Sequence, residues 1–387
     1  MVNYDFLSVY FYSVPNLRFN NDPYKKYNLY EFATRVTRKN KDNVSNLPLT
    51  ISAQYGLVDQ VSFFNKTVAS KDMSGYYLLK NGEFAYNKSY SNDYPWGAIK
   101  RLDLYDMGCL STLYICFKTN DNIVNSNYLV HYFESSKWHK QVADIAGEGA
   151  RNHGLLNIVV NDFFNTKHAV PTIENQIKIA GFLDLIEKRI QTQIKIINDY
   201  KILKNHIIKS FIKQNGTSYL LLEIAELGRG RVINSAEISK QKNPIYPVYS
   251  SQTSNNGIMG YLDNYDYEGE YITWTTDGAN AGTVYYRNGK FNCTNVCGIL
   301  KIKNGYDAYY ISNILNCYTK KYVSTNLANP KLMNNVMTNI KINLPSIEQQ
   351  KHSSKILQSI EYRVEIEEDI KLNLVKQKAF LLKNMFI

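Results

Sequence analysis

Residues 171–213 and 345–387 carry apolar side chains at spacings of three and four, which is the pattern of a long amphipathic helix. Each stretch opens on a proline, which suits the start of a helix, and neither contains a second one. The apolar stripe is narrow, and a narrow stripe over this length is typical of a coiled-coil seam. The pattern predicts two long helices whose seam and partner-docking positions are Leu183, Ile186, Ile190, Ile197, Leu357, Ile360, Val364 and Leu381.

The two helical stretches are copies of one element. They align without a gap at a constant offset of 174 residues (345 minus 171). Identical residues in this alignment include Leu183/Leu357, Ile186/Ile360, Glu187/Glu361 and Lys204/Lys378. The repeat favours packing of each helix against the other copy. Packing of each helix on its own domain alone stays open as the alternative.

The segments outside the helices, 1–170 and 214–344, read as two related β-rich domains with some helix. Residues 246–276 alternate short runs of Tyr, Val, Ile and Trp with Asn-Gly, Asp-Asn and Glu-Gly turns. Helical patterns are limited to stretches such as 126–144 and 307–323. Similar peptides recur at offsets of 192 (27–33 and 219–225) and 187 (82–84 and 269–271). The chain is therefore expected to be α+β, a tandem of domain 1–170, helix 171–213, domain 214–344 and helix 345–387.

Composition adds a preference for an anionic partner. The chain has 387 residues and a formal net charge of +11, and the excess is spread over all four segments. This balance is compatible with nucleic acid, and the tyrosines and asparagines could stack on bases or bond their edges. The same Lys, Asn, Ile and Tyr bias also results from an A+T-rich genome. No stretch reaches membrane-spanning length and no signal-like start is present, so we expect a cytoplasmic protein.

The candidate chemical motifs are incomplete. Residues 243–246, Asn-Pro-Ile-Tyr, resemble the NPPY signature of amino-methyltransferases, but Ile245 replaces a proline and no glycine-rich cofactor loop is found. The glycine loop 278–283 lacks the Gly-Lys-Ser/Thr of a phosphate-binding loop and reads as a hairpin connection. Six scattered histidines and five irregularly spaced cysteines predict no metal site, and reduced thiols are expected. The chain is expected to bind rather than to react.

Taken together, the motifs resemble the specificity subunit of type I restriction-modification enzymes over nearly the whole chain. The Pro-[Ser/Thr]-Ile-Glu-x-Gln opening of each helix, at 171–176 and 345–350, is similar to the conserved regions of that family. The lysine-rich helix ends at 204–212 and 378–386 are similar as well, and residues 246–300 resemble one class of its target-recognition domains.

The resemblance implies two β-rich target-recognition domains separated by two long helices that form an antiparallel coiled coil. Each domain would read one half of an asymmetric bipartite site in double-stranded DNA. Two modification (methyltransferase) subunits would dock along the helices, and restriction/motor subunits would join them. The chain itself would hold no cofactor, because S-adenosylmethionine would be bound by the modification partner.

Polar residues in loops near strand ends are the candidate DNA contacts. Arg and Lys would hold phosphates or guanine, and Asn and Gln would bond adenine edges. The candidates are Lys88, Ser89, Arg101, Arg151, Asn152, Ser251, Gln252, Thr253, Asn256, Asn280, Arg287 and Asn326. For each of them a solvated or turn-capping role stays open.

Two other functions remain open from the sequence. A self-sufficient DNA methyltransferase would bind S-adenosylmethionine by itself. A coiled-coil adaptor without a DNA role would show no salt-sensitive binding to duplex DNA. The target sequence and its spacer length do not follow from the residues, because readout also depends on loop geometry and DNA shape.

Overall fold

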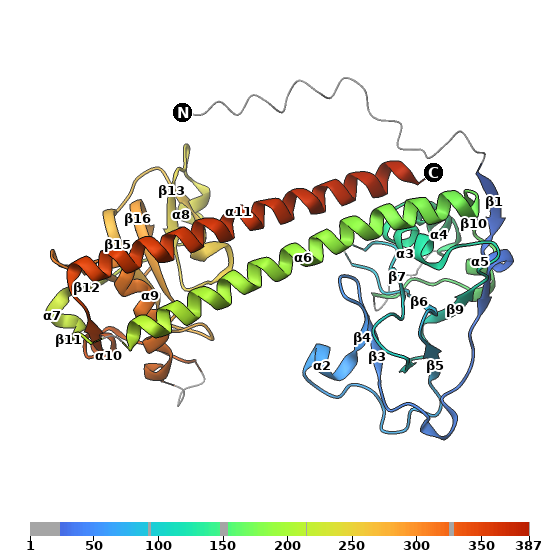
Figure 1. Ribbon diagram of the computed structural model, residues 1–387, viewed down its shortest axis with the longest axis horizontal. Helices are drawn as coiled ribbons and strands as arrows, with labels where there is room; N and C mark the ends of the chain where they lie inside the picture. The colour runs from blue at the N-terminus through green and yellow to red at the C-terminus, as the bar shows by residue number, and fades with distance from the viewer. Residues whose placement is uncertain (1–23, 92–93, 148–153, 214, 325–328, 387) are drawn as a thin grey trace. The chain divides into compact units, whose positions relative to one another are not determined.

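The computed structural model describes residues 24–91, 94–147, 154–213, 215–324 and 329–386 (Figure 1). The chain folds into two compact units. Unit 1 comprises Met1–Thr192 and Ile370–Ile387, and unit 2 comprises Gln193–Asp369. Each unit contains one β-rich domain, called domain 1 or domain 2, and a part of each of the two long helices.

The predicted long helices are confirmed as α6 (Ile173–Ile212) and α11 (Ile347–Met385). Within each unit, Figure 1 shows the segments of α6 and α11 side by side. In unit 2 they run antiparallel, because contacts pass from Gln193 and Glu367 to Lys204 and Glu361. In unit 1, Leu183 near the start of α6 shares one apolar cluster with Leu381 near the end of α11. Five of the eight predicted seam positions are buried: Leu183, Ile190, Ile197, Leu357 and Leu381. The other three are half-buried: Ile186, Ile360 and Val364.

One polar pair interrupts the seam. Gln193 and Glu367 are 7% and 3% exposed, and the Gln193 amide donates to both the carbonyl and the carboxylate of Glu367. Arg363, one turn before Glu367, supplies a charge at 2.6 Å. A buried polar pair costs stability relative to an apolar one but disfavours a shifted register, because slippage would leave both groups without partners.

Domain 1 is built on a four-stranded sheet of order β2-β9-β6-β7. Its strands are β2 (Ala33–Arg35), β9 (Ile115–Thr119), β6 (Phe84–Asn87) and β7 (Ala98–Arg101). Two separate two-stranded sheets, β3-β4 (Leu49–Ser52, Gly56–Asp59) and β5-β8 (Tyr77–Lys80, Met107–Leu110), surround a second apolar cluster. Helices α3 (Ser126–Glu134), α4 (His139–Ile145) and α5 (Val160–Phe164) follow the sheet, and α2 (Gln60–Phe64) follows β4.

Domain 2 contains a six-stranded sheet of order β12-β17-β15-β16-β13-β14. Its strands are β12 (Ala225–Arg229), β17 (Cys297–Ile302), β15 (Tyr267–Thr275), β16 (Val284–Cys293), β13 (Tyr246–Tyr249) and β14 (Ile258–Leu262). Helices α8 (Ser235–Ser239), α9 (Ala308–Tyr318) and α10 (Asn334–Thr338) complete it. Here β13 joins the edge of β16 through a short parallel pairing, so the extra strands extend the main sheet.

The first four strands of domain 2 repeat the sheet of domain 1. In both sheets the edge strand pairs with a late strand, which pairs with the central strand, which in turn pairs with the strand that follows it. The matching hydrogen-bond ladders place Phe84 opposite Phe117 and Ile272 opposite Leu300. Because Ala33↔Thr119 matches Ala225↔Ile302, Phe117 corresponds to Leu300 and Phe84 therefore to Ile272. The offset at the central strand is 188 (272 minus 84), so the sequence alignment at 187 is wrong by one residue.

A two-stranded ladder closes each domain at its base. In unit 1, β1 (Lys25–Asn28) pairs with β10 (Lys167–Val170), and in unit 2, β11 (Thr217–Leu220) pairs with β18 (Lys341–Leu344). A short helix follows each first strand, α1 (Leu29–Phe32) and α7 (Leu221–Ile224). Both ladders place the end of the domain beside its beginning.

A glutamine ties each domain to its helix. Gln176 on α6 accepts a hydrogen bond from the Asn125 N–H at 2.7 Å and donates to the Pro171 carbonyl at 2.8 Å. Gln350 on α11 accepts from the Asp307 N–H at 3.1 Å and donates to the Pro345 carbonyl at 2.9 Å. Asn125 and Asp307 are the N-caps of α3 and α9. The Pro-x-Ile-Glu-x-Gln motif therefore couples the helix start to the domain.

Two local predictions need correction. Glu268-Gly269 is not a turn, because it lies inside β15, where Gly269 faces Gly289 and both have positive φ. The helical pattern 126–144 forms two helices, α3 and α4, and 307–323 forms α9 followed by a 3-10 turn at Thr319–Tyr322. The other predicted features, strands in 246–276 and a hairpin connection at 278–283, are confirmed. No helix in the described residues combines the length and apolar character that a membrane span requires.

Candidate nucleic-acid interface

Two loops of domain 2 bring five of the predicted residues together. The first, 250–257, connects β13 to β14, and the second, 276–283, connects β15 to β16. The Asn280 amide donates to the Thr253 hydroxyl at 3.1 Å, which joins the two loops. This group, the domain 2 loop cluster, contains Ser251, Gln252, Thr253, Asn256 and Asn280; the last three are exposed, and the first two are half-buried.

The backbone of the first loop is unusual. Asn255, Asn256 and Gly257 have φ values of 48°, 51° and 81°, all in the left-handed region. Only Gly enters this region without cost, and Asn tolerates it better than most residues. Two consecutive asparagines in this conformation carry backbone strain and display their amides to solvent.

Arg287 is buried beneath the first loop and donates a hydrogen bond to its backbone, so its role differs from the predicted DNA contact. The residue is 4% exposed, and its guanidinium carbon lies 3.6 Å from the Tyr249 ring centroid and 4.4 Å from that of Tyr285. It donates to the Asn256 carbonyl at 2.9 Å and to the Thr273 hydroxyl at 3.2 Å. Burial lowers the pKa of Arg287, and the Tyr249 hydroxyl opposes the shift. A guanidinium occupied in this way is not available to a phosphate or a guanine, so we assign Arg287 to holding the loop.

Two lysines outside the predicted set, Lys320 and Lys331, flank the same cluster. Lys320 donates to the Ala281 carbonyl at 3.1 Å and to the Thr283 hydroxyl at 3.3 Å, and Lys331 lies 3.6 Å from Asp277. The sequence shows a Lys-Lys pair at 320–321, but only the fold places Lys320 beside the glycine loop. The cluster is thus a surface of neutral hydrogen-bonding groups with cations at its border.

The corresponding place in domain 1 holds Lys88 and Ser89. They follow β6 as Thr276 and Asp277 follow β15. Ser89 forms a bridge with Leu155, and Asp277 forms one with Lys331, so each loop meets the segment that follows the domain's main helices. Lys88 is half-buried and Ser89 is exposed. Arg151, Asn152 and Asn326, predicted in these same segments, lie outside the described residues.

Arg101 does not belong to either loop cluster. It pairs with Phe84 at the start of β6, whereas Lys88 follows the end of that strand. Its guanidinium bonds Asp103 at 2.6 Å, Ser126 at 2.9 Å and Asn127 at 2.7 Å. Since these contacts tie β7 to α3, the position is better explained by domain stability than by DNA contact.

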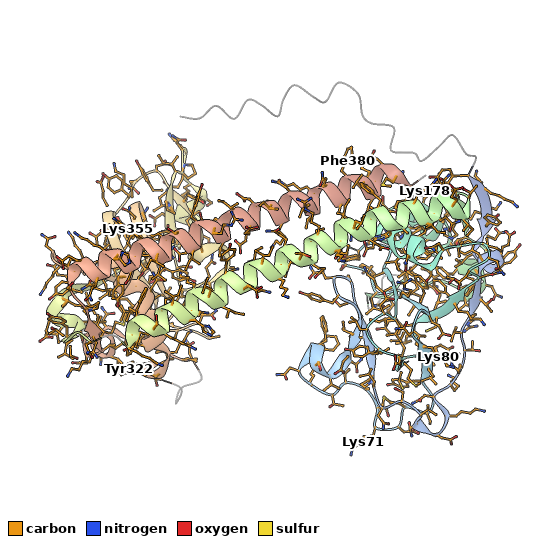
Figure 2. The ribbon with its side chains drawn as sticks, in the orientation of Figure 1. Lys71, Lys80, Lys178, Tyr322, Lys355 and Phe380 are labelled. Carbon is orange, nitrogen blue, oxygen red and sulfur yellow. The ribbon has the colours of Figure 1, made fainter. Side chains whose placement is uncertain are left out.

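Apolar side chains are also exposed on both long helices. On α6 they include Ile177, Phe182, Leu185, Ile202 and Leu203, and on α11 they include Tyr362, Leu372, Val375 and Phe380. Leu185 is 66% exposed and Phe380, labelled in Figure 2, is 46% exposed. These residues lie outside the buried seam between the two helices.

The other candidate motifs have structural positions. Asn243 lies in a bend before β13, and its N–H donates to Asp263 at 2.8 Å. All five cysteines are free thiols, with Cys317 exposed and the rest buried. The described part of the chain contains no group of three or more His, Cys, Asp and Glu side chains arranged to hold a metal ion.

Comparison with known proteins gives a consistent result. A family model for the type I restriction modification DNA specificity domain matches residues 217–377. The N-terminus of a putative type I specificity subunit from Mycoplasma pneumoniae is 42% identical over 142 residues, which are 36% of this chain and 75% of that protein. Another from the same organism is 37% identical over 196 residues, covering 49% and 81%. The MpnII specificity subunit, also from M. pneumoniae, is 41% identical over 146 residues, covering 37% and 43%.

The fold has solved counterparts. The crystal structure of a type I restriction-modification S subunit from M. genitalium matches with a TM-score of 0.57 and 15% identity, covering 97% of this chain and 99% of that one. A chain from a study of complex assembly and conformational transition of the type I system matches with a TM-score of 0.58 and 15% identity, covering 93% and 96%. At this identity the likeness concerns the fold.

Proposed function

Because the chain belongs to the family of type I restriction-modification specificity subunits, its role is DNA specificity, and we propose that each of its two domains reads one half of an asymmetric bipartite site. The subunit directs adenine methylation or restriction by partner subunits and carries no catalytic centre of its own. It acts in the cytoplasm on double-stranded DNA.

The observation that carries the proposal is one framework that bears two different loop clusters. The same sheet, closing ladder and glutamine contact occur in both units. Domain 2 presents an amide-rich cluster around Asn256 and Asn280, whereas domain 1 presents Lys88 and Ser89 at the matching place. Two domains that share a framework but differ in their contact residues would recognise two different half-sites.

The chemistry of the domain 2 cluster suits base edges. Asn and Gln side chains offer a donor and an acceptor that match adenine, and serine and threonine hydroxyls contact several bases. Lys320 and Lys331 at the border suit phosphates, which position the protein without specifying sequence. We propose Ser251, Gln252, Thr253, Asn256 and Asn280 as base or backbone contacts of the second half-site, and Lys88 and Ser89 as contacts of the first.

The exposed apolar residues of α6 and α11 support docking of two modification subunits along the helices. Those partners would bind S-adenosylmethionine, and restriction/motor subunits would join the assembly. This arrangement predicts that the purified chain neither binds S-adenosylmethionine in calorimetry nor methylates DNA until a modification subunit is added. Methyl transfer by the chain alone would favour the self-sufficient methyltransferase instead.

Exchange of one domain tests the proposal. Residues 214–344 are replaced by the corresponding domain of a relative, and methylated adenines are mapped in the genome of a host that carries the modification partner. One half of the recognised sequence should change and the other should remain. An unchanged site, or changes in both halves, would contradict reading by separate domains, and a lack of salt-sensitive DNA binding by the assembled complex would leave only an adaptor role.

A further inference from the structure

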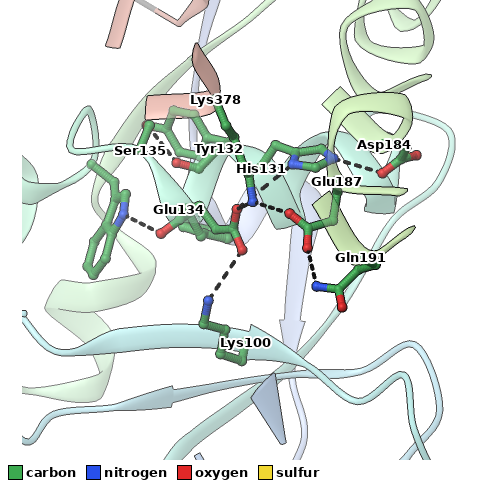
Figure 3. Close-up of polar contacts among 11 residues, drawn as sticks. Lys100, His131, Tyr132, Glu134, Ser135, Asp184, Glu187, Gln191 and Lys378 are labelled. Atoms are coloured by element: carbon green, nitrogen blue, oxygen red, sulfur yellow. Dashed lines mark hydrogen bonds and ion pairs between the residues drawn. The ribbon is translucent and has the colours of Figure 1, made fainter. Parts of the chain in front are cut away.

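A lysine near the end of α11 joins domain 1 to both long helices of its unit (Figure 3). The Lys378 ammonium lies 2.7 Å from Glu134 Oε2 and 2.8 Å from Glu187 Oε2. Glu134 is the last residue of α3 in domain 1, and Glu187 lies on α6. Lys378, which belongs to α11, therefore links that helix to domain 1 through Glu134 and to α6 through Glu187.

The surroundings show that this contact is built into the interior. The Lys378 side chain is 16% exposed, and that of Glu134 is 24% exposed. Lys100 on β7 approaches Glu134 at 3.4 Å, and His131 on α3 contacts Asp184 of α6 at 2.8 Å. Burial disfavours the charge of Lys378, but Glu134 and Glu187 outweigh it, so the pKa of Lys378 lies above its usual value. Removal of either partner would leave a poorly solvated charge, which costs more than the loss of a surface pair.

Because Glu134 is the last residue of α3, the contact with Lys378 holds the C-terminal end of that helix. The other end of this helix is already fixed, because the N-cap Asn125 donates its N–H to Gln176 of α6 at 2.7 Å. Lys378 holds the C-terminal end, nine residues further along, which is about 13 Å at the rise of an α-helix. Attachment at one point permits a helix to pivot, whereas attachment at both ends fixes its direction.

Unit 2 repeats the ion pair, but among its described residues no side chain of a long helix forms a hydrogen bond or ion pair with the C-terminal end of α9. Lys204 of α6 pairs with Glu361 of α11, and these residues are the repeat counterparts of Lys378 and Glu187. The domain 2 partner of Glu361 is the Tyr309 hydroxyl, in the first turn of α9. That turn is also where Gln350 holds the N-cap Asp307, so both contacts fall at the same end of α9.

We propose that Lys378 is a positioning residue that holds domain 1 in one orientation on the helix pair and thereby restricts the spacer between the two half-sites. The inference rests on the proposed function, since the spacer has meaning only if both domains read DNA. Lys378 acts on the domain and does not itself contact DNA. Its effect passes through α3 to the sheet that carries the Lys88 loop.

The test uses the full chain with its modification subunit and compares methylation of the native site with sites whose spacer is one base pair longer or shorter. Glu134→Ala removes the domain's contact but leaves Lys378 paired with Glu187, so the helix pair is retained. We expect the preference for the native spacer to fall about tenfold, with an unchanged sequence in each half-site. Lys378→Met should do the same, and Lys378→Arg should restore most of the preference.

Lys201→Met is the matched control, because Lys201 pairs with Glu368 across the same helices at 2.8 Å and forms no hydrogen bond or ion pair with a domain among the described residues. It should keep the wild-type spacer preference. If Lys378→Met fails to fold, Glu134→Ala decides the question alone, with melting temperature as the check on folding. Wild-type spacer discrimination by folded Glu134→Ala would overturn the inference while leaving the proposed function intact. A wild-type complex that methylates no specific site would instead refute the proposed function itself.

Discussion

Strands β6 and β15 occupy the same place in their domains, yet what surrounds them differs. Around β6 the additional strands form separate small sheets, whereas in the sheet of β15 two additional strands, β13 and β14, extend the sheet beyond β16. The contacts that mount each domain are nearly the same, down to the glutamine that holds the N-cap of α3 or α9. The comparison teaches that the contacts between domain and helix are retained in both units, while the strands and loops that we propose to contact DNA differ.

The largest effect is expected from charges in the shared seam. Leu183 and its repeat counterpart Leu357 are both fully buried. The double variants Leu183→Asp/Ile186→Asp and Leu357→Asp/Ile360→Asp should each destabilise their own unit by at least about 4 kcal/mol, through lost apolar burial and an unsolvated carboxylate. Chemical denaturation followed by circular dichroism measures this.

Leu185→Asp is the control for the seam, because Leu185 is 66% exposed. It should leave the stability of the chain nearly unchanged while weakening the docking of a modification subunit. Equal stability of the control and the seam variants would show that the seam is misassigned. Strongly unequal effects of the two double variants would show that the helix pair does not contribute equally to the stability of the two units.

A buried histidine should make the two units respond differently to acid. His168 on β10 is replaced by Ile342 at the matching position of β18. Its Nδ1 accepts from the Tyr132 hydroxyl at 2.9 Å and its Nε2 donates to the Thr166 hydroxyl at 2.8 Å, an assignment that follows because Thr166 uses its own hydrogen on Phe163. Burial lowers the pKa of His168 from 6.5 to about 4.

The sign of this shift sets the prediction. The folded state favours the neutral ring, so stability is full above pH 6.5 and declines as the pH falls toward 4, by at most about 3 kcal/mol. The decline should affect unit 1, and His168→Ile should remove most of it. His139, whose pKa burial also lowers, leaves a smaller residual slope of the same sign. Hydrogen exchange between pH 4.5 and 7 resolves the two units, and an undiminished slope in the variant would contradict the assignment.

The next prediction concerns the support of the domain 2 loop. Arg287→Met keeps much of the side-chain volume but removes the bond to Asn256 and the stacking on Tyr249 and Tyr285. We expect a loss of about 1–3 kcal/mol in stability and weaker recognition of the second half-site, with the first half-site intact. Denaturation and methylation mapping measure these two effects. A lower salt slope of DNA binding without a change in stability would return Arg287 to the interface as a phosphate contact.

The smallest effect on stability is expected at Asn256. Because φ at this position is 51°, Asn256→Gly relieves strain while it removes the amide. Stability should change by less than about 1 kcal/mol, whereas discrimination at one base of the second half-site should fall by about 1–3 kcal/mol. Binding titrations against single-base variants of the site measure this, and Asn81→Gly, in a turn of domain 1 that lies before β6, serves as a control. Unaltered discrimination at every base would remove Asn256 from the interface.

The long helices and the repeated domains could be predicted from the sequence, but the strand register and the contacts around the domain 2 loop cluster could not. The 174-residue repeat, the helix starts and the hairpin character of 278–283 are local patterns, and local patterns predicted them correctly. The strand register did not follow, because the ladder partner of Phe84 is fixed only when β9 and β6 meet. The burial of Arg287 requires rings from β13 and β16 together, and no spacing in the sequence indicates that meeting.

The closing ladders have a practical consequence for protein engineering. Thr217 and Leu344 face each other as hydrogen-bonded strand neighbours, so the two points at which the chain passes between helix and domain 2 lie about 5 Å apart. A foreign domain whose own termini are adjacent could be grafted at this single attachment point without a linker that spans any distance. The β1–β10 ladder, with Lys25 facing Val170, likewise places the two ends of domain 1 beside each other, and its Val170 end leads into α6. The two domains thus begin and end in the same way, so a foreign domain that replaces one of them should also be able to replace the other.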